Sequence, residues 1–95
     1  MPAYVVVSVD VHDAERYADY IEQAPESIAR HGGRYLARGG RTEVLDGDWD
    51  PKRFVILEFP RFEDARAWWA SEEYADAKAL RHATATSRMI LVDGL

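Results

Sequence analysis

The chain has 95 residues, no cysteine and a formal net charge of −5. This length fits one domain, the missing cysteine excludes disulfides and thiolate chemistry, and the acidic balance argues against nucleic-acid binding, which needs a basic surface. No apolar run approaches the ~20 residues of a membrane span and no secretion signal opens the chain, so we expect a cytoplasmic protein that binds neither nucleic acid nor membrane.

The first predicted elements are a strand and an interrupted helix. Residues 3–10 are rich in β-branched side chains and apolar on both faces, as in a strand covered on both sides. Asp13 is a suitable N-cap for the helix that follows. Pro25 has no N–H to donate, so we expect it to break or kink the helix near residues 23–24 and to start a second segment that ends at His31.

The middle of the chain predicts strands separated by a bend. Residues 33–51 fit two short strands or one bent strand, with a bend at the glycine pair Gly39–Gly40 and a loop at the end. Residues 53–59, RFVILEF, form a dense apolar strand that carries a single acid.

Two helices and a strand complete the prediction. A short helix covers residues 62–70, and Ser71 can cap a second helix over residues 72–80 or beyond. Residues 87–93 form the last strand. The resulting β-α-β-β-α-β order predicts an α+β fold of the ferredoxin-like type. Its four-stranded sheet would leave one apolar face uncovered, and a second copy of the chain could cover that face in a homodimer.

Two adjacent tryptophans in the 62–70 helix cannot share one buried stripe, because successive helical residues point about 100° apart. Taking Phe62 as the reference direction places Ala65 and Trp69 on the core side. Trp68 then falls at the edge of the stripe and should be half-buried. It could seal the helix edge, line a pocket near Arg81, or contact a second subunit.

Charged residues within apolar segments form the candidate site. Arg38, Glu43, Arg53, Glu58 and Arg81 lie in or beside predicted strands and helices that face the core. They could form a structural ion-pair network, or a site for an anionic or carbonyl group with a carboxylate that transfers protons. In either case we expect Glu58 to be paired with one of these three arginines.

No metal or cofactor is predicted. His12, His31 and His82 do not share a metal-ligand spacing, and the sequence contains no phosphate-binding loop, dinucleotide fingerprint or G-x-S-x-G motif.

Several stretches, in order along the whole chain, resemble the domain-of-unknown-function 1330 family: HGGRYLARGG, EVLDGDW, RFVILEFP, AWWASEEY and ILVDG. The family belongs to the dimeric α/β-barrel superfamily, so the resemblance implies a ferredoxin-like protomer and a homodimer with sheet-to-sheet contact. Its recurrent motif positions correspond here to Arg38, Gly39, Gly40, Glu43, Trp49, Arg53, Glu58, Phe59, Trp68, Tyr74 and Arg81. This chain departs from it at Trp69, where members often have tyrosine.

The resemblance leaves two functions open, because the superfamily includes cofactor-free monooxygenases, muconolactone-type isomerases and haem-binding proteins. In the first, the protein is an acid–base enzyme for a small anionic or carbonyl-bearing metabolite. Glu43 or Glu58 would move protons, and arginines would hold the charged oxygen. The substrate-binding residues would be Arg38, Trp49, Arg53, Trp68, Tyr74 and Arg81. In the second, it is a non-catalytic binding or stress-related module, and the arginines are structural.

Overall fold

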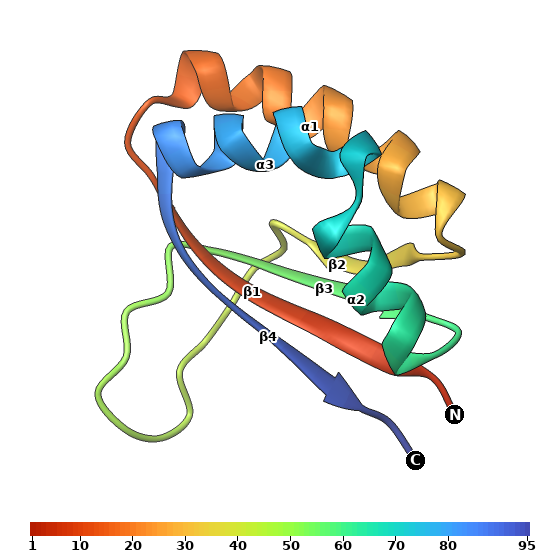
Figure 1. The fold of residues 1–95 in the computed structure, drawn as a ribbon. Helices are drawn as coiled ribbons and strands as arrows, with labels where there is room; N and C mark the ends of the chain where they lie inside the picture. Colours follow the sequence, from red (N-terminus) through yellow and green to blue (C-terminus); the bar gives the residue numbers. More distant parts are fainter.

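The computed structural model describes residues 1–95 as four strands and three helices. In chain order these are β1 (Ala3–Val11), α1 (Ala14–Arg30), β2 (Arg34–Arg38), β3 (Arg53–Phe59), α2 (Phe62–Ala70), α3 (Glu72–Thr84) and β4 (Ala85–Asp93). The antiparallel sheet has the strand order β2-β3-β1-β4, and the helices lie on one face of it (Figure 1). The predicted ferredoxin-like α+β fold is confirmed. None of the helices has the length and apolarity that crossing a membrane requires.

The sheet has one covered and one open face. On the covered face, alternate residues such as Val5, Val7 and Leu57 are buried beneath the helices. The strand register places the intervening residues on the other face, which no helix covers. Across its centre Ile56, Val6 and Ile90 form one row, and Ile90 is 63% exposed. The open face therefore carries an exposed apolar row at its centre.

The expected break at Pro25 is wrong, since α1 runs through it without interruption. A proline at this position cannot donate a hydrogen bond to the carbonyl oxygen of Ile21, four residues earlier. The Arg38 guanidinium donates to that oxygen instead, at 2.7 Å. The tertiary contact therefore satisfies the carbonyl that proline leaves free.

The prediction of two short strands or one bent strand across residues 33–51 is also wrong. Only Arg34–Arg38 forms a strand, and the chain from Gly39 to Lys52 runs as an irregular loop that projects away from the sheet (Figure 1). Gly39 leaves the strand with a φ of 68°, in the left-handed region that favours glycine. No further edge is available beside β3, because β1 and β2 already flank it.

The assignment of the two tryptophans is reversed. Trp68 is 1% exposed and belongs to the core, whereas Trp69 is 46% exposed. The buried stripe of α2 runs through Ala65 and Trp68, while Phe62, the reference for the prediction, is itself only half-buried. Lys78 covers the outer indole, with its Nζ 3.9 Å from the ring centroid of Trp69.

The predicted cap at Ser71 is confirmed. Its hydroxyl accepts a hydrogen bond from the backbone N–H of Tyr74 at 3.2 Å, and donates to the carbonyl oxygen of Trp68 at 2.7 Å. The turn between α2 and α3 is thereby fixed, so that Trp68 and Tyr74 face the same core.

Candidate functional site

Two hollows lie on either side of a partition made by Trp68, Arg81 and Met89. The first, here called the inner cavity, has a volume of about 30 Å³ and lies between α1, α3 and the sheet. The second, here called the groove, has a volume of about 810 Å³ and runs between α2, α3 and β4. All three partition residues line both hollows.

Arg81 is the most deeply buried charged residue of the site. It is 3% exposed. Its Nη1 donates to the hydroxyl of Ser87 on β4, and its Nη2 lies 3.4 Å from Nε2 of His82. Its Nε is buried and has no hydrogen-bond partner. The guanidinium is therefore oriented by its end nitrogens and retains one unused donor.

Arg53 also lines the inner cavity. Its Nε is buried without a partner, and its guanidinium carbon lies 5.8 Å from the ring centroid of Tyr17. A Cβ atom on Gly39 would lie only 2.5 Å from Nη1 of Arg53. The glycine therefore has a second role beyond its backbone conformation, because it leaves room for this guanidinium.

Arg38 is the exposed member of the three arginines that line the inner cavity. Its guanidinium carbon lies 4.4 Å from the ring centroid of Tyr35, while Nη2 is bonded to α1 as described above. No carboxylate lines the inner cavity, and the ion pairs of the protein involve none of these three arginines. The predicted network of arginines with Glu43 and Glu58 is therefore not formed.

Tyrosines supply the other polar groups of the inner cavity. Tyr17, Tyr20 and Tyr35 line it, and the hydroxyls of Tyr20 and Tyr74 lie 2.8 Å apart. Burial is the main cause that raises the pKa of Tyr20, with the neighbouring Tyr74 adding to it, and burial likewise raises the pKa of Tyr35. The phenols of Tyr20 and Tyr35 therefore remain neutral and do not balance the charge of the arginines.

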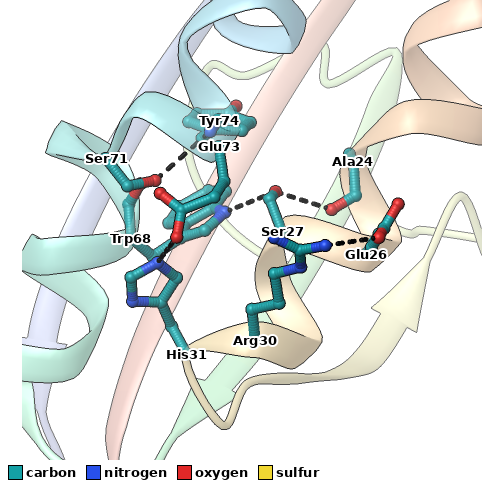
Figure 2. A network of polar contacts seen from close by, with 9 residues as sticks. All are labelled: Ala24, Glu26, Ser27, Arg30, His31, Trp68, Ser71, Glu73 and Tyr74. Atoms are coloured by element: carbon teal, nitrogen blue, oxygen red, sulfur yellow. Dashed lines mark hydrogen bonds and ion pairs between the residues drawn. The ribbon is translucent and has the colours of Figure 1, made fainter.

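A polar network holds the Trp68 side of the partition in place (Figure 2). The indole Nε1 donates to the hydroxyl of Ser27 at 3.1 Å, and that hydroxyl donates to the carbonyl oxygen of Ala24 at 2.9 Å. The ring of Tyr74 packs against the indole with a centroid separation of 4.2 Å. Trp68 is thus fixed both by hydrogen bonds to α1 and by aromatic packing against α3.

Glu58 does not reach any of the arginines proposed from the sequence. It lies on the open face of the sheet, opposite Arg34 in the strand register, and accepts a hydrogen bond from Nε of Arg34 at 2.9 Å. Glu58 is thus paired with an arginine, but with Arg34 and not with Arg38, Arg53 or Arg81, because alternation along β3 turns Glu58 away from the core. The Arg34 side chain is 70% exposed.

We expect the Glu58–Arg34 pair to contribute little to stability. A double-mutant cycle of Glu58→Gln and Arg34→Gln should give a coupling energy of about 0.2–1 kcal/mol, typical of solvent-exposed pairs. Urea unfolding of the four proteins measures it. A coupling well above this range would show that the pair is removed from solvent by a contact that covers this part of the open face.

Glu43 and Trp49 lie in the loop between β2 and β3 and line neither hollow of the candidate site. They border a separate surface hollow. Trp49 is 56% exposed and makes an edge contact with Phe54, with ring centroids 5.7 Å apart. Of the sequence-predicted residues, the fold therefore brings together Arg38, Arg53, Trp68 and Arg81, with Tyr74 directly behind them.

The sequence did not single out His82 or the three cavity tyrosines. His82 borders the groove, and desolvation, followed by the charges of Arg81 and Lys78, lowers its pKa. The imidazole is therefore more readily neutral at physiological pH. The tyrosine signal was available, since Tyr17 and Tyr20 are three residues apart on the buried side of α1.

No three His, Asp or Glu side chains are grouped so that they could hold a metal ion.

The fold and its buried arginine site define a ferredoxin-like α+β protein with a hollow between its helices and sheet. The chain belongs to the DUF1330 family, a domain of unknown function, whose family model matches residues 2–95. No curated protein matches the sequence significantly.

Solved structures share the fold at low sequence identity. RPA0582 of Rhodopseudomonas palustris, a protein of unknown function, is 23% identical with a TM-score of 0.81, over 99% of this chain and 82% of that chain. A dimeric ferredoxin-like protein of unknown function from Jannaschia sp. CCS1 is 10% identical with a TM-score of 0.73, over 99% and 100% of the two chains. SnoaB of Streptomyces nogalater, a cofactor-independent oxygenase, is 14% identical with a TM-score of 0.67, over 99% and 93%.

Proposed function

We propose that the protein binds a small, flat metabolite with a carbonyl or anionic oxygen in the groove, and acts on it by acid–base chemistry without a cofactor. The observation that carries this proposal is the position of Arg81. Its buried guanidinium borders a groove of about 810 Å³ that has no carboxylate in its lining. This volume falls within the range of roughly 300–1,000 Å³ that small-molecule sites occupy.

The groove can hold such a molecule through its walls and its charge. Trp68, Trp69 and Leu91 supply apolar and aromatic surface, and Arg66 adds a second guanidinium. Aromatic walls favour planar ligands, and charge-assisted hydrogen bonds from arginine are stronger than neutral ones.

His82 is the base best placed for proton transfer beside Arg81. In its neutral form it can accept a proton from a carbon next to a carbonyl group. The electron pair of the broken C–H bond then forms an enolate, and Arg81 stabilises the enolate oxygen. Return of the proton to another carbon gives isomerisation. In the oxygenation route the enolate carbon bonds to dioxygen, the resulting peroxide takes up the proton held by His82, and loss of water from the hydroperoxide leaves a new carbonyl group. The fold shared with a cofactor-independent oxygenase supports the second route.

One observation favours the alternative of a non-catalytic binding or stress-related module. Glu43 and Glu58, the carboxylates that the sequence nominated for proton transfer, lie outside both hollows. If the protein is an enzyme, a ligand that binds the groove should also be isomerised or should cause oxygen uptake. If it is a non-catalytic module, the ligand should bind without either reaction.

Binding itself can be tested with a panel of small aromatic and unsaturated acids and ketones, by thermal shift and tryptophan fluorescence. We expect a ligand of the wild-type protein to bind at least about tenfold more weakly to Arg81→Gln, because one charged hydrogen bond contributes roughly 1.5–3 kcal/mol. Trp68→Phe should also weaken it.

The control is Arg61→Gln, which removes an exposed arginine paired with Asp64 outside both hollows. Its affinity for the ligand should equal that of the wild type. If a ligand binds Arg81→Gln and Arg61→Gln equally well, the groove beside Arg81 is not its binding site.

We further propose that the protein is a homodimer with its open sheet faces in contact. The central row of this face is Ile56, Val6 and Ile90, and no element of the same chain covers it. The related Jannaschia protein is described as dimeric, which supports this assembly.

A further inference from the structure

We propose that the inner cavity is a binding site for a small monoanionic group of about carboxylate size, held by Arg38, Arg53 and Arg81. This goes beyond the proposed function, because the inner cavity lies across the Trp68–Arg81–Met89 partition from the groove. It also gives Arg38 and Arg53, which do not line the groove, a ligand of their own.

The first argument is charge. Guanidinium groups stay protonated in proteins, and burial of a charge is costly unless an opposite charge or full hydrogen bonding compensates it. Three guanidiniums line one small cavity that contains no carboxylate. The phenols of Tyr20 and Tyr35 are neutral, and the rings of Tyr17 and Tyr35 offer only cation–π contacts. The protein itself therefore supplies no anion to balance this positive charge.

The second argument is unused hydrogen-bonding capacity. Nε of Arg53 and Nε of Arg81 are both buried and both lack an acceptor, and both residues line the same cavity. Buried polar groups without partners are rare in folded proteins. One anion with two or three oxygens can accept from both and can also neutralise their charge.

The third argument is size. The cavity volume of about 30 Å³ exceeds the roughly 10–15 Å³ needed for one water and suits a group of roughly two to four heavy atoms. Water molecules alone would satisfy the two Nε donors but leave the charge uncompensated. Formate, nitrate and the carboxylate end of a larger acid share the required chemistry.

The test reads the arginine Nε–H signals of the 15N-labelled protein by NMR during titration with sodium formate or nitrate. We expect the Arg53 and Arg81 signals to shift and saturate. The melting temperature should rise by roughly 5–10 °C at ten times the dissociation constant. Benzoate and cinnamate form the second arm. Signal shifts with formate indicate that the ligand is a free small ion. Signal shifts with the larger acids alone indicate that the ligand is the carboxylate end of a metabolite. Both results support an anion site.

Matched variants separate specific binding from the general effect of ionic strength. Arg53→Gln should weaken formate binding at least about tenfold, as judged from the Arg81 signal, while Arg61→Gln should bind like the wild type. Arg38→Gln, which replaces an exposed residue, provides the same test should Arg53→Gln fail to fold.

The inference is overturned if no anion moves the Arg53 and Arg81 signals, or if formate acts equally on the wild type and both cavity variants. Failure of the proposed function has a different signature. In that case no compound of the panel of acids and ketones changes the His82 signals or the Trp69 fluorescence, whereas the arginine signals still respond to formate.

Discussion

Replacement of Trp68 by alanine should lower the free energy of unfolding by about 3–5 kcal/mol, as for other large aromatic side chains removed from a core. The indole is 1% exposed, bonds to Ser27 and packs between Phe59 and Tyr74. Its loss creates a large cavity and leaves the Ser27 hydroxyl without that donor. For a domain of this size the melting temperature should fall by roughly 15–30 °C.

The adjacent Trp69 provides the matched control. It is 46% exposed and contacts Lys78 at the surface, so Trp69→Ala should change the unfolding free energy by less than about 1 kcal/mol. Urea unfolding followed by circular dichroism measures both variants without relying on tryptophan emission. Equal losses for the two variants would contradict the burial that separates them.

Local sequence signals were enough to predict the fold. The density of β-branched and apolar residues placed β1 and β3, and the capping side chains of Asp13 and Ser71 placed the starts of α1 and α3. These signals depend on neighbours within a few residues. The uninterrupted path of α1 through Pro25 depends instead on Arg38, which is distant in sequence, so no local rule could predict it.

The candidate site was predicted in part, and the failures have a common cause. Arg38, Arg53 and Arg81 meet at the inner cavity because β2, β3 and α3 present them to the covered side of the sheet. Glu58 was grouped with them because it stands in the same apolar segment, yet a strand alternates its faces and turns this side chain outward. Whether a charged residue in a strand belongs to a site is decided by its register, which composition does not reveal.

The homodimer should be detectable as about twice 10.8 kDa by light scattering at micromolar concentration, and Ile90→Glu should reduce it to the monomer mass. Ile90 is 63% exposed on the open face and lies beside Val6 in the strand register. In the dimer a carboxylate at position 90 would be buried in the contact with the second subunit without an opposite charge, which an apolar interface cannot accommodate.

The same carboxylate introduced at Ala67, an exposed position of α2 on the helix side, should leave the dimer intact. The melting temperature provides a second criterion, since a dimer stabilises its protomers by mass action and melts at higher temperature as its concentration rises. The wild type and Ala67→Glu should show this dependence, and Ile90→Glu should lose it. A wild-type chain with monomer mass and a concentration-independent melting temperature would mean that the open face is solvated, and that the apolar row of Ile56, Val6 and Ile90 needs another explanation.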